Sequence, residues 1–232
     1  MVAEKRAPEI IVLENVCGTL TSHGGKDFSA ICSALQDTGY RFGALVMDAA
    51  LFVPHSRPRL FVIAIRDDLN VPEDMVDEEP MAIWHTGTLK TAYGNLRPKV
   101  KKDWIWWRIP TPTKRKTRLS DLIEENPDSV NWHKPAETRQ LLSMMSDINL
   151  DKVRAAKRSG RRIVGTIYKR TRRDENGRKV QRAEVRFDDI AGCLRTPAGG
   201  SSRQVIMVVE GRKVRSRLIS SRETARLMGL AD

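Results

Sequence analysis

The chain has 232 residues, 40% of them hydrophobic, which is enough for one large domain or two small ones with a buried core. Its 41 Lys and Arg residues outnumber 29 Asp and Glu, and a formal net charge of +12 attracts polyanions, of which nucleic acid is the commonest. The sequence has no run of roughly 20 apolar residues, the length that a membrane span needs, and no apolar signal-peptide core. Its cysteines lack the spacing of zinc sites or disulfide frameworks, which predicts a cytoplasmic location.

The N-terminal quarter of the chain predicts an α/β sheet. Residues 9–13 contain a short apolar run, Ile10-Ile11-Val12-Leu13, rich in β-branched residues and typical of a buried strand that is covered on both faces. Residues 26–38 predict a helix, because apolar side chains recur at helical spacing and Gly39 follows the last turn. Residues 42–47 and 60–65 are two more apolar strands. Strand, helix and strand in this order indicate an α/β arrangement.

The middle of the chain is less regular. The acidic stretch 71–80 predicts a surface linker, and residues 81–135 are rich in proline and tryptophan. One helix is predicted there over residues 119–126, with Thr117 or Ser120 as its N-cap. The cluster of Trp104, Trp106 and Trp107 is interpreted as core rather than as a platform for stacking bases.

Residues 136–159 again show a helical pattern, and two β-ribbons follow. The first pairs residues 163–173 with 179–187 around Asn176-Gly177, the strongest short hairpin signal. Residues 151–186, which include this ribbon, contain fourteen Lys and Arg against four Asp and Glu. A solvated charged hairpin is the plainer interpretation of such a ribbon, but the imbalance favours attraction to phosphates.

A second ribbon and a final helix complete the predicted elements. The ribbon pairs residues 205–209 with 214–219 across a Glu210-Gly211 turn. The helix covers residues 221–228, where Ser220 and Glu223 form a capping box and Gly229 ends the helix.

Three segments resemble the DNA (cytosine-5) methyltransferase family. The first is Leu13-Glu14-Asn15-Val16, and the second is Pro54-His55-Ser56-Arg57-Pro58-Arg59-Leu60-Phe61-Val62. The third combines residues 194–204, LRTPAGGSSRQ, with residues 217–232, RLISSRETARLMGLAD. Their order and spacing are similar to the second half of the family, and they extend over almost the whole chain.

The resemblance implies catalytic roles for Glu14, Asn15, Arg57 and Arg59. In the family a thiolate adds to cytosine C6, and C5 then attacks the methyl group of S-adenosylmethionine. Glu14 matches the carboxyl that faces the Watson–Crick edge, Asn15 the amide that braces the nucleophile loop, and Arg59 the arginine that holds the flipped base and its carboxylate partner. Without the resemblance, Glu14 is a surface carboxylate, Asn15 a turn residue and the arginines ordinary loop residues.

Two positions depart from the family pattern, and a third, Cys17, could be mistaken for the catalytic nucleophile. His55 stands where the family usually has Gln, and we expect it to keep a polar contact to the backbone. Cys193 stands where Thr is usual, in a position that contacts phosphate. Cys17 is the only thiol close in sequence to Glu14, but the family nucleophile lies in an upstream Pro-Cys loop, so Cys17 is interpreted as a loop residue.

The resemblance also implies a DNA-binding set, in which Gly permits close backbone approach and hydroxyl groups and Arg bond phosphates or base edges. The basic ribbon adds three arginines to this set. Its members are Arg195, Thr196, Gly199, Gly200, Ser201, Ser202, Arg203, Gln204, Arg170, Arg172 and Arg173.

The predicted fold is therefore a partial, Rossmann-like sheet of the S-adenosylmethionine-dependent methyltransferases plus a mixed, β-rich target-recognition region. Residues 1–75 are assigned to the catalytic α/β domain, 76–215 to the target-recognition region that binds double-stranded DNA, and 216–232 to a helix that returns to the catalytic domain.

Several family segments have no counterpart in the sequence. These are the Phe-x-Gly-x-Gly loop and the acidic residue that bind S-adenosylmethionine, the Pro-Cys loop and the final Gly-Asn-Ser-Val segment. The chain alone is therefore expected to bind no cofactor and to be inactive. Three interpretations remain: one chain of a split methyltransferase whose second polypeptide supplies the missing parts, an inactive fragment, or a non-catalytic DNA-binding module.

Overall fold

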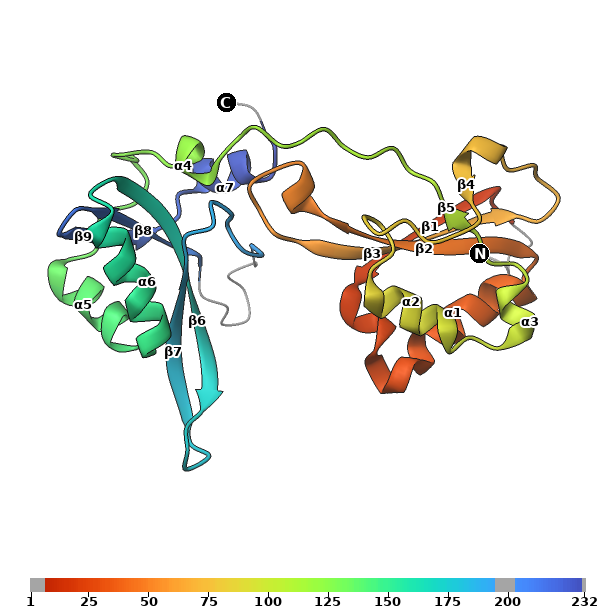
Figure 1. Ribbon diagram of the computed structural model, residues 1–232, viewed down its shortest axis with the longest axis horizontal. Helices are drawn as coiled ribbons and strands as arrows, with labels where there is room; N and C mark the ends of the chain where they lie inside the picture. Colours follow the sequence, from red (N-terminus) through yellow and green to blue (C-terminus); the bar gives the residue numbers. More distant parts are fainter. Residues whose placement is uncertain (1–6, 195–202, 231–232) are drawn as a thin grey trace. The chain divides into compact units, whose positions relative to one another are not determined.

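The structure is a computed structural model that describes residues 7–194 and 203–230 (Figure 1). The chain divides into two compact units. Unit 1 contains residues 1–48 and 58–113, and unit 2 contains residues 49–57 and 114–232. These boundaries differ from those of the predicted regions, since residues 76–113 belong to unit 1 and the last helix belongs to unit 2. The functional roles of the predicted regions stay predictions.

Unit 1 is built on a three-stranded antiparallel sheet. Its strands are β1 (Ile10–Val16), β2 (Tyr40–Asp48) and β3 (Pro58–Arg66), and the order across the sheet is β1-β3-β2. Strand β3 runs antiparallel to both neighbours, so β1 and β2 are parallel to each other. Helix α1 (Lys26–Asp37) connects them, after two 3-10 turns at Cys17–Leu20 and Ser22–Gly25. The predicted strand–helix–strand order is confirmed.

The prediction that residues 9–13 form a buried strand is wrong for the described residues. Strand β1 lies at an edge of the sheet, and four of its apolar side chains are exposed. Their exposed fractions are 58% for Ile10, 59% for Val12, 38% for Leu13 and 53% for Val16. The sequence shows that these residues are apolar, but burial also depends on which other residues cover the strand.

Helices cover one face of this sheet, as Figure 1 shows. They are α1, α2 (Gly87–Gly94) and α3 (Pro98–Lys101), and they share a core with β2 and β3. Helix α2 lies in a region predicted to be irregular. Its N-cap is Thr86, whose hydroxyl accepts the backbone N–H of Leu89 at 3.3 Å, and it buries Leu89 and Ala92.

The acidic stretch 71–80 is not a linker between the two units. It forms a 3-10 turn at Glu73–Met75 and strand β4 (Val76–Asp77), which pairs with β5 (Trp106–Trp107) inside unit 1. The tryptophan interpretation is confirmed. Trp104 packs edge-on against Phe28 and Phe42 in the core.

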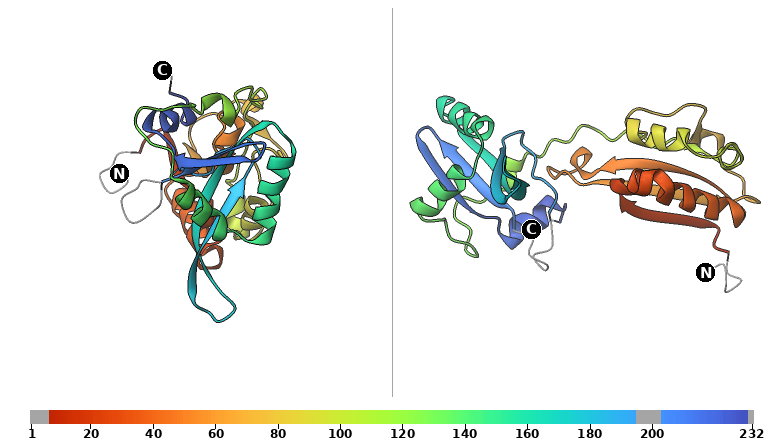
Figure 2. Two further views of the ribbon diagram at one scale, coloured as in Figure 1. Left: turned by 90° about the vertical axis from the view of Figure 1, so that its left-hand side faces the viewer. Right: turned by 90° about the horizontal axis from the view of Figure 1, so that it is seen from below.

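Unit 2 contains a four-stranded antiparallel sheet in the order β7-β6-β8-β9. The strands are β6 (Arg162–Arg173), β7 (Lys179–Arg186), β8 (Val205–Glu210) and β9 (Lys213–Leu218). Both predicted ribbons are confirmed. At the first turn, Gly177 has a φ of 74°, which glycine adopts without the strain that a β-carbon causes. The β6–β7 hairpin extends well past its neighbouring helices (Figures 1 and 2).

Helices line both faces of this second sheet. Helices α5 (Pro135–Ser143) and α6 (Asp147–Arg158) share one core with the sheet. On the other face, α4 (Leu119–Leu122) and α7 (Ser221–Leu227) share a second core with it. A short 3-10 turn, Ala49–Leu51, also belongs to this unit.

Two helix predictions in unit 2 need correction, and a third is confirmed. The single pattern over 136–159 is interrupted between α5 and α6. Helix α4 is shorter than predicted and its N-cap is Arg118, whose backbone N–H donates to the Asp121 carboxylate at 2.8 Å. The Ser220–Glu223 capping box at α7 is confirmed. None of the helices that the structure describes is long and apolar enough to cross a membrane.

Candidate functional site

Glu14 and Arg59, far apart in sequence, meet in unit 1. The register of β1 and β3 places Val16 opposite Arg59 and Glu14 opposite Phe61, so both side chains extend from the same face of the sheet. The Arg59 Nε atom lies 3.1 Å from a Glu14 carboxylate oxygen. The predicted association of this arginine with this carboxylate is therefore present.

The two partners differ in exposure, and this difference decides what the pair can do. The side chain of Arg59 is 17% exposed, whereas that of Glu14 is 56% exposed. An exposed pair of this kind contributes no more than about 1 kcal/mol to stability. Glu14 is thus held in one orientation by Arg59 while much of its carboxyl surface remains accessible to a ligand that offers hydrogen-bond donors.

Asn15 lies beside Glu14 in sequence but points to the other face of the strand. Its side-chain oxygen accepts the backbone N–H of Val16 at 2.8 Å. This local contact is typical of an amide at the end of a strand.

Cys17 follows β1 and is partly buried. Burial raises the pKa of its thiol, and the nearby Asp48 carboxylate raises it further, while Arg59 lowers it. The net effect is a raised pKa, so the thiol stays protonated near neutral pH. Since the thiolate is the nucleophilic form, this environment opposes a nucleophilic role for Cys17.

In unit 2, residues 54–57 run beside residues 191–194. The backbone N–H of Ala191 donates to the Pro54 carbonyl and that of Ser56 donates to the Ala191 carbonyl, both at 2.8 Å. His55, which is 3% exposed, accepts the Leu194 N–H at its Nε2 atom at 3.1 Å. The expected polar contact between His55 and the backbone is confirmed.

Arg57 contacts the same short segment. Its Nη1 atom lies 3.4 Å from the Leu194 carbonyl oxygen and 3.4 Å from the Cys193 sulfur. Arg57 belongs to unit 2, whereas Glu14, Asn15 and Arg59 belong to unit 1. These two contacts link the Arg57 side chain to the residues that come directly before the predicted recognition residues in the chain.

Most of the predicted recognition residues lie outside the described residues; these are Arg195, Thr196, Gly199, Gly200, Ser201 and Ser202. Arg203 is exposed and donates to the Ile219 carbonyl at 3.3 Å. Gln204 is buried, and its backbone carbonyl accepts the Ile219 N–H at 2.9 Å. Arg203 and Gln204 are therefore fixed against the residues that precede α7.

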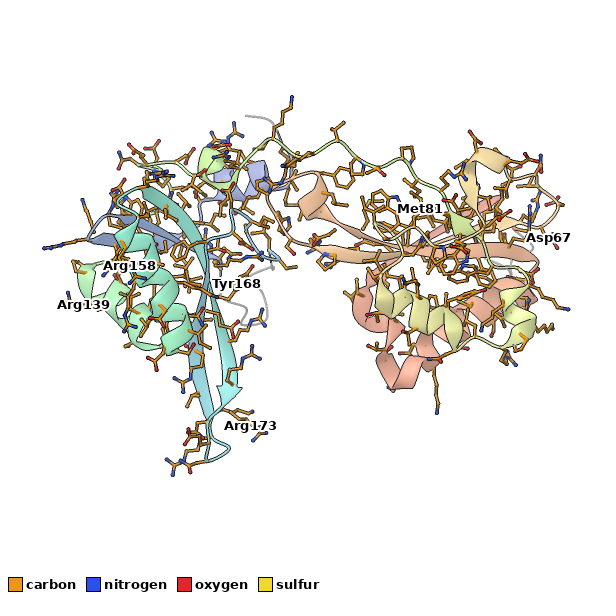
Figure 3. The ribbon with its side chains drawn as sticks, in the orientation of Figure 1. Asp67, Met81, Arg139, Arg158, Tyr168 and Arg173 are labelled. Atoms are coloured by element: carbon orange, nitrogen blue, oxygen red, sulfur yellow. The ribbon has the colours of Figure 1, made fainter. Side chains whose placement is uncertain are left out.

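The basic hairpin separates its predicted arginines between two faces. Arg170 and Arg172 share a face and both contact Glu184, at 3.4 and 2.8 Å. Arg173 lies on the other face by strand alternation, and its side chain donates to the Gly177 carbonyl at 3.0 Å. Figure 3 shows Arg173 near the tip of the hairpin and Tyr168 nearer the body of unit 2.

Sequence reasoning gave no role to Arg217, which forms a buried ion pair with Glu223. Both side chains are fully buried, and two Arg217 nitrogens donate to the two Glu223 oxygens at 2.6 and 2.8 Å. Burial raises the pKa of Glu223, but hydrogen bonds from Arg217 and from the backbone N–H groups of Ser220 and Glu124 outweigh it and leave the pKa below its ordinary value. The capping-box pattern in the sequence predicted a structural role for Glu223, but nothing in the sequence indicated that Arg217 would pair with it.

The described residues hold no cluster of three His, Cys, Asp or Glu side chains that suits a metal ion.

The chain is 24% identical, over 231 residues, to the orphan methyltransferase M.SPBetaI of Bacillus phage SPbeta and to the putative type II methyltransferase M.BsuMIIP of Bacillus subtilis (strain 168). Each match covers 99% of this chain and 48% of the relative, so the chain spans about half the length of these curated relatives.

Two further comparisons are more partial or more distant. The type II methyltransferase M.PspPI of Psychrobacter sp. (strain TA137) is 38% identical over 87 residues, which are 37% of this chain and 20% of the relative. The crystal structure of S. pombe Dnmt2 methyltransferase aligns with a TM-score of 0.40 and 16% identity, over 98% of this chain and 57% of that one.

The family model described as C-5 cytosine-specific DNA methylase matches residues 1–232. This match extends over all three motif segments and both units. The chain belongs to the C-5 cytosine-specific DNA methylase family.

Proposed function

We propose that this chain supplies the base-holding residues and the DNA-recognition surface of a DNA (cytosine-5) methyltransferase. The ion pair of Glu14 and Arg59 carries the proposal, because it presents an oriented, accessible carboxyl at the end of a strand. Such a carboxyl accepts a hydrogen bond from N4 of a flipped cytosine and, when protonated, donates one to N3. Neutralising charge at N3 eases addition of a thiolate at C6.

The exposure of strand β1 supports the proposal that residues outside this sequence pair with it or cover it. Within the described part of the chain β1 pairs only with β3, so its other edge is free, and apolar Ile10, Val12 and Val16 are exposed on one face. Long apolar edge strands of this kind normally pair or become covered. We propose that the sheet of unit 1 is part of a larger Rossmann-like methyltransferase sheet, and that other residues supply its cofactor site.

We propose that the cofactor site and the nucleophile, like the rest of the sheet, are supplied by residues outside this sequence. The family uses S-adenosylmethionine. The sequence contains no Phe-x-Gly-x-Gly pattern and no Pro-Cys pair. We propose that residues outside this sequence, in the same or in a second polypeptide, bind S-adenosylmethionine and supply the thiolate. The chain alone is then inactive.

DNA binding is assigned to unit 2, and specifically to one face of the β6–β7 hairpin. Arg170 and Arg182 are directly opposed across the two strands, on the face that also carries Tyr168. That face is continuous with the side of the sheet on which Ala191 packs. Phosphate groups bound along this face would lie near residues 191 and 192, which come shortly before the predicted recognition segment in the chain.

A matched pair of double variants tests this assignment. The variant R170Q/R182Q removes two charges from the Tyr168 face, and K169Q/K179Q removes two from the other face. We expect the first to reduce the slope of log affinity against log salt by about 1.8, because each lost phosphate contact accounts for roughly 0.9. The measurement is fluorescence anisotropy with duplex DNA at several salt concentrations.

The control K169Q/K179Q is expected to change the slope by less than half as much. Equal losses from both variants would contradict the assignment to one face, and absence of any loss would remove the hairpin from the DNA interface.

A DNA-binding module without catalysis is the second candidate, and the basic hairpin favours it. The two functions differ in their use of Glu14. A pure DNA-binding module needs no oriented carboxyl at β1, so its affinity and function would be insensitive to Glu14→Gln.

A further inference from the structure

A second basic surface of unit 2 lies at the end of its sheet away from the tip of the β6–β7 hairpin (Figure 1). Strand β6 starts there at Arg162, shortly after helix α6, and the β8–β9 turn lies beside it. The register pairs Arg162 with Glu210 of β8, and Glu210 with Lys213 of β9. Residues 157–162 and 210–215 are therefore neighbours in space, and we call these two segments the basic sheet end.

The basic sheet end carries seven Lys or Arg residues and a single acidic residue, Glu210. The two carboxylate oxygens of Glu210 lie 3.7 Å from Arg162 and 3.4 Å from Arg215. One carboxylate cannot neutralise two guanidinium groups, so positive charge remains at this pair of contacts. Arg212 and Lys213 are exposed, and neither forms an ion pair with a residue in the ranges 7–194 and 203–230.

The dipole of helix α6 accounts for only part of this charge. Cations near the C-terminus of a helix interact favourably with its dipole, which explains Lys157 and Arg158 in the last turn of α6. Arg161, Arg212 and Lys213 lie outside any helix, so the dipole gives no reason for their charge. Like charges gathered in two neighbouring segments repel one another, and a bound polyanion offsets that repulsion.

The spread of these cations fits an extended polyanion. They come from α6, β6 and the β8–β9 turn, across strands that lie about 5 Å apart. Duplex DNA presents one phosphate charge about every 1.7 Å along its axis, so cations spaced in this way meet several phosphates of one duplex.

The basic sheet end is separated from the DNA-binding face assigned to the hairpin by the length of β6. Arg162 and Arg170 have side chains on the same face of this strand, because strand residues alternate between faces. At about 3.3 Å per residue, they lie about 26 Å apart along the strand, which equals roughly eight base pairs of a duplex.

We propose that the basic sheet end binds the phosphate backbone of duplex DNA that flanks the stretch held by the β6–β7 hairpin. The proposal rests on the proposed function, in which one face of that hairpin binds DNA. A duplex that extends well beyond the hairpin gains phosphate contacts that a short duplex lacks. The basic sheet end thus adds affinity for long DNA without reading its sequence.

Duplex length distinguishes the two contacts. The variant R212Q/K213Q removes two exposed charges from the basic sheet end and leaves both contacts of Glu210 in place. With a duplex of about 30 base pairs, we expect the slope of log affinity against log salt to fall by about 1.8, at roughly 0.9 for each lost phosphate contact. With a duplex of about 8 base pairs, we expect no change. The measurement is fluorescence anisotropy of the full chain with labelled DNA.

Two further variants separate the local effect from net charge and from altered structure. K90Q/K99Q removes the same charge from exposed positions of unit 1 and should leave both slopes unchanged. R212K/K213R keeps both charges at the basic sheet end and should behave as the unaltered chain does. Equal losses from R212Q/K213Q with both duplexes, or no loss with the long duplex, would overturn the proposal.

The hairpin variant R170Q/R182Q separates failure of this inference from failure of the proposed function. It should reduce the slope with the short and the long duplex alike. Loss from R170Q/R182Q with none from R212Q/K213Q would overturn this inference alone. Loss from R212Q/K213Q on the long duplex, with none from R170Q/R182Q, would keep the basic sheet end as a DNA contact and overturn the assignment to the hairpin.

Discussion

Replacing Glu14 with glutamine is expected to lower methyl transfer by roughly 10²- to 10⁴-fold in the complete enzyme, the range of a positioned acid–base group. Glutamine keeps a hydrogen-bonding side chain of the same length, but it has no proton to transfer to cytosine N3. The ion pair with Arg59, at 3.1 Å, would also lose its negative partner. The measurement is the transfer of a labelled methyl group to duplex DNA with the cofactor-binding part present.

Two comparisons separate a chemical role of Glu14 from a structural one. Glu9, one residue before β1, provides the matched control, and E9Q should leave the rate unchanged. E14Q should also leave the denaturation midpoint unchanged within error, because an exposed ion pair contributes little stability. Equal rates for E14Q and the unaltered enzyme would show that the carboxyl does not act on the base.

Breaking the buried Arg217–Glu223 pair is expected to give the largest loss of stability. The Glu223 carboxylate accepts hydrogen bonds from Arg217 and from the backbone N–H groups of Ser220 and Glu124, while Arg217 also donates to the Glu124 carbonyl. The pair thus joins β9, α7 and the segment after α4. Glu223→Ala leaves a buried guanidinium unpaired, and we expect a loss of about 3–5 kcal/mol in the free energy of unfolding of unit 2.

Chemical denaturation followed by tryptophan fluorescence measures this loss, because Trp132 stacks against Arg217 with the guanidinium 5.0 Å from the ring centroid. A double variant, R217M/E223L, should recover much of the stability, since it leaves no buried charge. The control R154A breaks an exposed pair with Asp151 and should cost less than about 1 kcal/mol. If E223A lowered the free energy of unfolding by as little as R154A, the stabilising role of the buried pair would be contradicted.

The same pair implies an acid sensitivity with a definite sign. Because the pKa of Glu223 is lowered in the folded state, its contribution to stability is present above the pKa of the unfolded chain. That contribution is lost as the pH falls through the lower folded-state pKa. Unit 2 of the R217M/E223L variant should therefore lose less stability in acid than the unaltered protein.

Local chemistry explains which elements could be predicted from the sequence. The β6–β7 hairpin depends on a turn at Asn176-Gly177, and α7 depends on the capping box of Ser220 and Glu223. These signals involve residues close together in the chain. Neighbouring residues alone determine the hairpin turn and the helix cap, and the structure confirms both predictions.

Elements that depend on distant residues were harder to predict. Helix α2 contains Gly87 and Gly94 at its ends and is stabilised by burying Leu89 and Ala92 against unit 1. The acidic stretch 71–80 joins unit 1 because β4 pairs with β5, thirty residues later in the chain. Nothing in either local sequence indicates its distant partner.

In the candidate site, too, some contacts could be predicted from the sequence and others could not. The meeting of Glu14 with Arg59 was expected from the family resemblance, and so was a polar contact of His55 with the backbone. The burial of Arg217 was not, because arginine is usually exposed; here its contacts with Glu223, the Glu124 carbonyl and Trp132 compensate for its charge. The close approach of Tyr168 to Gly192 likewise depends on a fold that the sequence alone does not specify.

The most direct test of the central claim is methyl transfer from labelled S-adenosylmethionine to cytosine C5 in duplex DNA. The purified chain is assayed alone and mixed with a polypeptide that carries the family's cofactor loop and Pro-Cys nucleophile. We predict no transfer by the chain alone, transfer by the mixture, and loss of that transfer with E14Q. Transfer by the chain alone, or full activity of the mixture with E14Q, would contradict the account.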